Sequence, residues 1–140
     1  MKKIIIIDDQ FTVLKALITL LVEEGYKVDT ATNGYQGLIL IQSFIPDLII
    51  IDLNMPVWDG FKTIEQVRKY PNLKNIPIIV LTGIVNVDCI NKIKKFGIKD
   101  YIKKPFGKDE LLKRIKTTLD KQSIEEEIVS QYEEIEKSDN

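Results

Sequence analysis

Residues 48–60 read LIIIDLNMPVWDG, an apolar run that is interrupted by one aspartate and followed by a segment with proline and glycine. The run is too short for a helix and is apolar on both faces, which is typical of a parallel strand covered on both sides. We therefore expect a buried strand over Leu48–Leu53, with Asp52 near its end. An acid in such a strand is costly unless it is paired or used, so Asp52 is the first candidate functional residue.

Four other segments also have strand character. Ile4–Ile7 and Ile78–Thr82 are apolar throughout, as buried strands are, whereas Lys27–Thr30 and Asp100–Lys103 are more polar, as edge strands often are. Between the strands, apolar residues recur at spacings of three and four, which predicts helices. The helical residues are expected within 13–21, 35–44, 61–67, 90–96 and 111–119. Strand and helix thus alternate five times, which predicts an α/β fold: a doubly wound, five-stranded parallel sheet with helices on both faces.

Composition excludes several classes of function. The chain has 140 residues, 44% of them hydrophobic, which suits one domain with a real core. It contains no histidine and one cysteine, Cys89, so His-dependent catalysis, an intramolecular disulfide and a Cys-rich zinc site are excluded. No apolar run approaches the roughly 20 residues of a membrane span, and the start MKKIIIIDD is too short to be a signal peptide. We expect a soluble, cytoplasmic protein.

Polar residues that follow the predicted strands carry the chemistry. Ligands of such sheets bind outside the carboxyl ends of the strands. Asp8 and Asp9 follow the first strand, Asp52 lies near the end of the third, Thr82 ends the fourth, and Lys104 follows the fifth. Crowded carboxylates favour a hard divalent cation, and Mg²⁺ prefers carboxylates, water and phosphate oxygens. A carboxylate can also be the nucleophile that forms an aspartyl phosphate, with Lys104 and Thr82 supplying charge and a donor.

Each of these residues also has a purely structural interpretation. Asp8 and Asp9 can cap the first helix. Thr82 can simply end its strand, and Lys104 can be solvated. Together, at consecutive strand ends, the residues favour phosphoryl transfer.

The sequence resembles the receiver domain of two-component response regulators. The resemblance covers residues 2–119 and rests on IIIIDD at 4–9, LIIIDLNMPVWDG at 48–60, IIVLTG at 78–83 and DYIKKPF at 100–106. It implies a flavodoxin-like (βα)5 fold with strand order 2-1-3-4-5. It also implies cytoplasmic signalling in which a sensor histidine kinase or phosphotransfer protein donates a phosphoryl group.

The resemblance assigns a role to each site residue. Asp52 is expected to accept the phosphoryl group. Asp9 is expected to bind Mg²⁺ directly, Asp8 mainly through water, and Asn54 through its backbone carbonyl. Thr82 and Lys104 are expected to contact the phosphoryl group, and the Lys104–Pro105 bond to be cis. Tyr101 corresponds to the aromatic switch that turns inward when Thr82 moves.

Rival functions remain at this point. An aspartyl-phosphate phosphatase is expected to carry a second acid two residues after its nucleophile, where this chain has Asn54. A flavin-binding module lacks support because no phosphate-cradling loop follows the first strand. A receiver that works without phosphate is disfavoured by the complete acid set, and a receiver fragment of a larger regulator or hybrid kinase stays open.

Two further regions suggest partner contacts. Residues 92–116 hold ten basic and three acidic side chains, which indicates either a docking surface for a downstream protein or a solvated face. Nucleic acid is not an expected partner, because no recognition helix follows. We place the receiver at residues 1–120 and an acidic helical tail or linker at 121–140. Ile124, Ile128, Tyr132 and Ile135 lie at helical spacing in that tail. They can form a coiled-coil seam of a homodimer, a strip packed on the domain, or part of a linker.

Overall fold

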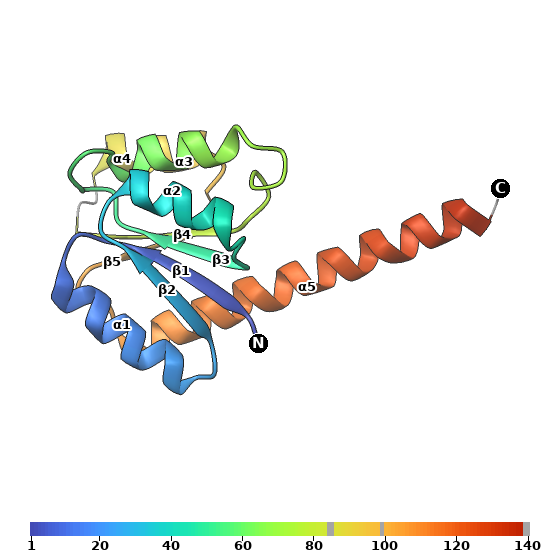
Figure 1. Ribbon diagram of the computed structural model, residues 1–140, viewed down its shortest axis with the longest axis horizontal. Helices are drawn as coiled ribbons and strands as arrows, with labels where there is room; N and C mark the ends of the chain where they lie inside the picture. The colour runs from blue at the N-terminus through green and yellow to red at the C-terminus, as the bar shows by residue number, and fades with distance from the viewer. Residues whose placement is uncertain (84–85, 99, 139–140) are drawn as a thin grey trace.

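The computed structural model describes residues 1–83, 86–98 and 100–138. Strands and helices alternate along the chain, which confirms the predicted α/β class (Figure 1). The elements are β1 (Lys3–Ile7), α1 (Phe11–Glu23), β2 (Lys27–Ala31), α2 (Gly34–Ser43), β3 (Leu48–Ile51), α3 (Gly60–Arg68), β4 (Ile78–Thr82), α4 (Val87–Lys95), β5 (Asp100–Lys103) and α5 (Lys108–Ser138).

The strands form one parallel sheet in the order β2-β1-β3-β4-β5, as the resemblance implied. The three apolar strands occupy the centre, and the two more polar strands lie at the edges. Hydrophobic burial explains this order, because a central strand is covered on both faces and an edge strand keeps one side open to water.

Two hydrophobic layers hold the helices to the sheet. Helices α2, α3 and α4 cover one face, and α1 and α5 cover the other (Figure 1). Neighbouring strand residues alternate between the layers: Ile5 and Ile7 of β1 pack in the first, and Ile4 and Ile6 pack in the second. All four side chains are at most 1% exposed, so β1 is anchored on both sides directly before the Asp8–Asp9 pair.

Strand β3 ends two residues earlier than the sequence predicted. The backbone N–H of Asp52 still donates to the carbonyl of Ile7 (3.0 Å), but the chain then turns away from the sheet. The N–H of Gly60, at the start of α3, donates to the carbonyl of Leu53 (2.9 Å). Asp52 therefore lies just after the strand and not within it, because Leu53 belongs to a turn closed by α3.

Helix α5 is unbroken from Lys108 to Ser138 and projects well beyond the sheet (Figure 1). Its apolar tail residues are between 56% and 63% exposed: Ile124, Ile128, Val129, Tyr132 and Ile135. The hypothesis that they pack on the domain is therefore wrong. Among the described residues, no helix combines the length and the apolar character that a membrane crossing requires, although α5 is long.

Candidate functional site

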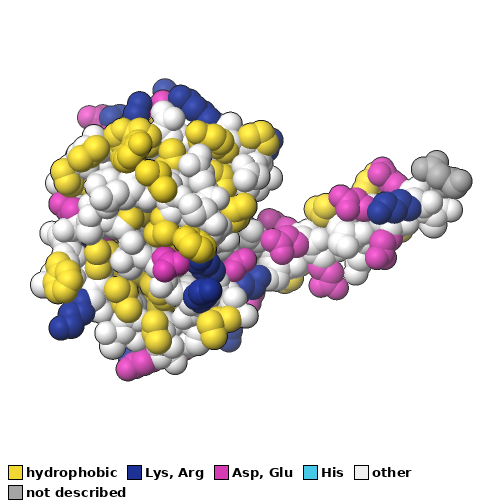
Figure 2. Space-filling model, in the orientation of Figure 1, with side chains coloured by type: hydrophobic (Ala, Val, Ile, Leu, Met, Phe, Trp, Pro, Cys, Tyr) yellow, Lys and Arg dark blue, Asp and Glu magenta, His cyan; other side chains and the backbone are white. Residues whose placement is uncertain are grey.

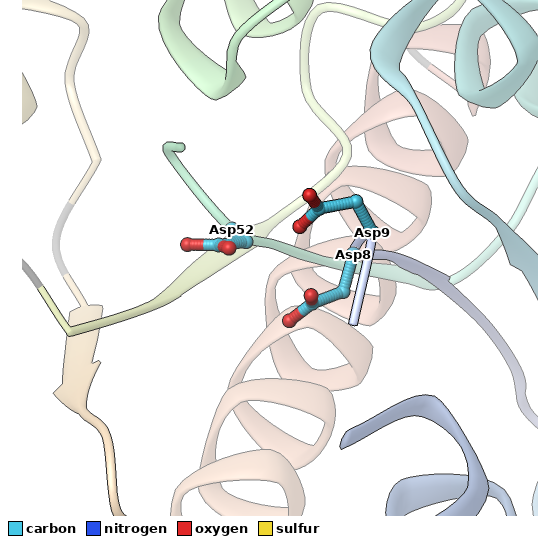
Figure 3. Close-up of side chains that lie close together, drawn as sticks. All are labelled: Asp8, Asp9 and Asp52. Atoms are coloured by element: carbon cyan, nitrogen blue, oxygen red, sulfur yellow. The ribbon is translucent and has the colours of Figure 1, made fainter. Parts of the chain in front are cut away.

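Three carboxylates meet at the carboxyl ends of the neighbouring strands β1 and β3. Asp8 and Asp9 follow β1, and Asp52 follows β3, which is hydrogen-bonded to β1 throughout its length. Carboxylate oxygens of the three residues lie within 4.8 Å of one another (Figure 3). Asp8 and Asp52 are buried, whereas Asp9 is exposed to solvent. The parallel topology thus brings together residues 44 positions apart, as the sequence predicted.

Lys104 supplies the positive charge of the site. Its Nζ lies 2.7 Å from Oδ2 of Asp8 and 3.3 Å from Oδ2 of Asp52, and it also donates to Oε1 of Gln10 (3.0 Å). The peptide bond between Lys104 and Pro105 is cis, as the resemblance implied. One ammonium group faces three carboxylates, so the site keeps a net negative charge.

Asp52 is in an environment that disfavours its charged form. Burial raises the pKa of this carboxyl group, and the nearby Asp8 carboxylate raises it further. Lys104 and the backbone N–H of Asn54, which donates to Oδ1 of Asp52 (3.4 Å), oppose the increase without cancelling it. A cation or a covalent bond that neutralises Asp52 is therefore favoured at this position.

Gln10 was not identified from the sequence. Its backbone N–H donates to Oδ1 of Asp8 (2.9 Å), while its side chain accepts from Lys104. Gln10 is also the N-cap residue of α1, and its own side chain makes no capping hydrogen bond. Because Oδ1 of Asp8 accepts the N–H of this residue, Asp8 contributes to the start of α1 as well as to the acid pocket. A glutamine after two acids carries no distinctive signal, so only the structure could identify its role.

Thr82 and Tyr101 lie on the neighbouring strands β4 and β5. Thr82 is the last residue of β4 and is fully buried, and its carbonyl accepts from the backbone N–H of Lys104 (2.8 Å). Tyr101 lies on the edge strand β5 and is 37% exposed. The ring of Tyr101 therefore lies at the surface. It belongs to the strand that Lys104 directly follows.

The loop between β3 and α3 is held in shape by close packing. A Cβ atom on Gly60 would lie 2.4 Å from the backbone oxygen of Asp52, so only glycine fits there without displacing the site. Val57, at the tip of the loop, has a φ of 68°, which is rare for a β-branched residue. Trp58 is half-buried and packs edge-on against Tyr35, with ring centroids 5.3 Å apart. This contact makes Trp58 part of the packing that holds the loop in shape.

The donor set fits a hard divalent cation. Oxygen ligands, net negative charge and partial exposure at Asp9 are the properties that Mg²⁺ sites use. Within the described residues, one group of at least three metal-binding side chains lies close enough together to hold a metal ion: Asp8, Asp9 and Asp52. Cys89 does not contribute to it: the thiol is buried in α4 and burial raises its pKa.

Comparisons with known proteins agree with this geometry. The sequence matches the family model of the response regulator receiver domain over residues 4–116. A curated relative from Porphyra purpurea, named "Probable transcriptional regulator ycf27", is 37% identical over 119 residues, which are 84% of this chain and 47% of the relative. The chain thus spans about half the length of the curated relatives it matches.

Two solved structures are similar over most of the chain. A CheY-like receiver domain protein from Methanospirillum hungatei has a TM-score of 0.84 and 30% identity, covering 89% of this chain and 98% of its own. The receiver domain of the sensor histidine kinase PA1611 from Pseudomonas aeruginosa has a TM-score of 0.78 and 25% identity, covering 84% and 97%. That structure contains a magnesium ion in its active-site cleft.

A sheet of this strand order, with an acid pocket and a lysine at its carboxyl edge, defines the class of CheY-like receiver folds. The chain belongs to the response regulator receiver domain family of two-component signalling.

Proposed function

We propose that the chain is a phosphorylation-controlled switch in which Asp52 accepts a phosphoryl group. A carboxylate oxygen of Asp52 attacks the phosphorus of a phosphohistidine, an O–P bond forms as the N–P bond breaks, and the imidazole leaves. The donor is a sensor histidine kinase or a phosphotransfer protein in the cytoplasm. The observation that carries this proposal is the meeting of Asp52 with two further carboxylates and the Nζ of Lys104 at the sheet edge.

We propose distinct roles for the residues around Asp52. Asp9, Asp52 and the backbone carbonyl of Asn54 hold Mg²⁺, and Asp8 acts mainly through water. When bound, Mg²⁺ neutralises charge on the phosphoryl oxygens. Lys104 Nζ, already 3.3 Å from Asp52, holds one phosphoryl oxygen, and the hydroxyl of Thr82 donates to another.

The output of the switch is a change in affinity for a protein partner. In this proposal the hydroxyl of Thr82 moves toward the phosphoryl group, and the ring of Tyr101 turns into the vacated space. Its present exposure at the β5 edge is consistent with an unphosphorylated state. The side formed by α4, β5 and α5 then differs between the two states and is read by a downstream protein. The chain thus assists its own phosphorylation and dephosphorylation but converts no separate substrate.

The proposed receiver comprises residues 1–120, and residues 121–140 extend it. The longer curated relatives support a second version, in which this chain corresponds to the receiver of a larger regulator or hybrid kinase. Both versions require the same chemistry at Asp52.

Phosphoramidate, a small donor with the N–P bond of phosphohistidine, tests the proposal. Incubation with phosphoramidate and Mg²⁺ should add one phosphoryl group to the wild-type chain, as measured by intact mass. Asp52→Asn should abolish the addition, whereas the control Asp109→Asn, which changes an exposed acid in α5, should retain it. Full labelling of Asp52→Asn would disprove the assignment.

A further inference from the structure

A cavity of about 560 Å³ lies at the edge of the sheet where the strands begin, opposite the edge that carries the acid pocket. We call it the amino-edge cavity. Three segments line it: the connection from α3 to β4, the connection from α4 into β5, and α5 where this helix leaves the domain. Its volume is in the range of about 300–1,000 Å³ that is usual for small-molecule sites. None of its described lining residues belongs to the acid pocket.

Arg68, the last residue of α3, places an unpaired positive charge at this cavity. Its Nη1 donates to the carbonyls of Lys74 (2.6 Å) and Ile76 (2.9 Å), which fixes the guanidinium against the segment before β4. The ion pairs formed by the described residues do not include Arg68. Burial lowers the pKa of this guanidinium, so its charged form would be stabilised by an anion in the cavity.

The other charges around the amino-edge cavity also favour an anion. Lys74 and Lys121 line it together with that guanidinium, whereas Asp100 and Glu125 supply negative charge. Asp100 is paired with Arg114 (3.2 Å), which offsets its charge. Figure 2 shows charged side chains of both signs where the projecting helix joins the domain. The cavity therefore combines an excess of cations with carboxylates that can accept hydrogen bonds from a ligand.

The remaining wall offers apolar surface and an unused acceptor. Ile76, Pro77 and Ile98 line the cavity. Gln122 lines it from α5, and its Oε1 is buried without a hydrogen-bond partner among the described residues. Rotation of this amide would break one long bond, from Nε2 to Oε1 of Glu126 (3.3 Å), and would turn a polar atom toward a ligand. An unpaired buried acceptor is costly, so a ligand that donates hydrogen bonds is favoured.

We propose that the amino-edge cavity binds a nucleoside monophosphate. The phosphate group meets the cations of Arg68 and Lys121, and the base packs on the apolar wall that includes Ile76. The ribose hydroxyls donate to Glu125 and Gln122. Inorganic phosphate would leave the apolar wall and these acceptors unused, and an uncharged nucleoside would leave the guanidinium unpaired. This inference goes beyond the proposed phosphorylation and does not depend on it.

Isothermal titration calorimetry on the full unphosphorylated chain, without Mg²⁺ or a phosphoryl donor, tests this inference. AMP, GMP, CMP and UMP are titrated separately, and at least one should bind at a single site with a dissociation constant of about 1 mM or lower. The matching nucleoside, ribose 5-phosphate and inorganic phosphate should each bind at least about tenfold more weakly, because each lacks a part that the cavity recognises.

Matched variants separate binding in the cavity from a general charge effect. Lys121→Glu, which changes an exposed side chain, should weaken nucleotide binding at least about tenfold. Lys113→Glu makes the same charge change at an exposed position of α5 that does not line the cavity, and it should leave the affinity unchanged. Arg68→Gln should weaken binding by a similar factor. Because Arg68 also holds two carbonyls, thermal unfolding verifies that this variant is folded.

Backbone amide signals locate the bound nucleotide. The titration should shift the signals of Gly97, Thr118 and Gln122, which line the amino-edge cavity. The signals of Asp8 and Asp9 should stay in place, because these acids lie at the opposite edge of the sheet.

Several results would overturn the inference. They are the absence of binding by all four nucleotides, equally tight binding of inorganic phosphate, and unchanged affinity in Lys121→Glu or in folded Arg68→Gln. An equal loss in Lys113→Glu, or amide shifts confined to the acid pocket, would also overturn it. Because no phosphoryl donor is present, none of these results bears on whether Asp52 is phosphorylated.

Discussion

Asp52 is buried next to another carboxylate. This position lowers the stability of the folded chain, but it holds a reactive group in place. Lys104 offsets part of the cost but is shared with Asp8 and Gln10. Because burial raises the pKa of Asp52, the folded state binds a proton there more tightly than the unfolded state does. The charged form therefore destabilises the fold, as is common for groups that await a ligand.

We predict that Asp52→Asn is more stable than the wild-type chain at neutral pH without Mg²⁺. Below the unfolded-state pKa of the carboxyl group both proteins are neutral at residue 52, and their free energies of unfolding should be similar. As the pH rises through the raised folded-state pKa, the wild-type chain loses stability relative to the variant. Urea unfolding across the pH range, without Mg²⁺, measures the difference. A variant that is less stable at neutral pH would contradict the burial argument.

Mg²⁺ binding should discriminate between the two adjacent acids. We predict that Asp9→Ala weakens Mg²⁺ affinity about 10–100-fold and that Asp8→Ala weakens it less, because a direct ligand contributes more than one acting through water. Trp58, six residues after Asp52, provides a fluorescence titration. Asp109→Ala is the control and should leave the affinity unchanged. Equal losses in Asp8→Ala and Asp9→Ala would contradict the assigned roles.

At the scale of elements, the start of α3 positions the loop that carries Asp52. We predict that Gly60→Ala lowers the free energy of unfolding by about 1–3 kcal/mol, because the added Cβ would displace the backbone at Asp52 and Leu53. The same displacement should slow phosphorylation by phosphoramidate. Gly83→Ala is the matched control: its Cβ would meet nothing within 4 Å, so its stability should stay within about 0.5 kcal/mol of the wild-type value. If both variants lost a similar amount of stability, the close approach of Gly60 to the backbone of Asp52 would not explain the effect.

The ends of β4 and the edge strand β5 carry the proposed conformational response. We predict that Thr82→Ala is still phosphorylated at Asp52 but loses most of the response of β5 and α4. Beryllofluoride, which mimics the phosphoryl group, should shift backbone amide signals from Asn86 to Phe106 in the wild-type chain and much less in the variant. The full wild-type shift pattern in Thr82→Ala would contradict the relay through its hydroxyl.

The elements differ in how far the sequence specified them. Apolar runs identified the central strands, because a strand covered on both faces must be apolar throughout. The end of β3 was placed two residues too late, since Leu53 is apolar for a different reason: it is buried under α3. The tail at 121–140 continues the preceding helix without a break, which helical periodicity alone does not predict, because it does not separate one helix from two.

The site was specified by topology more than by local sequence. Asp8, Asp9, Asp52 and Lys104 were found because each follows a strand that ends at the same edge. Gln10 was missed because its part depends on where the Lys104 side chain reaches. The positive φ of Val57 could not be predicted from the sequence either, since valine is an unfavourable residue for that conformation.

At the scale of the whole molecule, charge is divided unevenly between two parts of the chain. Residues 1–120 carry 18 basic and 14 acidic side chains, and residues 121–140 carry two and seven. The acid pocket lies within this basic part, because topology brings three carboxylates together there. The proposed function depends on which acid in that pocket forms the acyl phosphate.

Borohydride trapping in the wild-type chain identifies that acid most directly. Borohydride reduces an aspartyl phosphate to homoserine, and peptide mass mapping then locates the changed residue. After treatment with phosphoramidate and Mg²⁺, we predict conversion at Asp52 alone and none in a sample that receives no donor. Conversion at Asp8, Asp9 or Asp59, with Asp52 unchanged, would contradict the account.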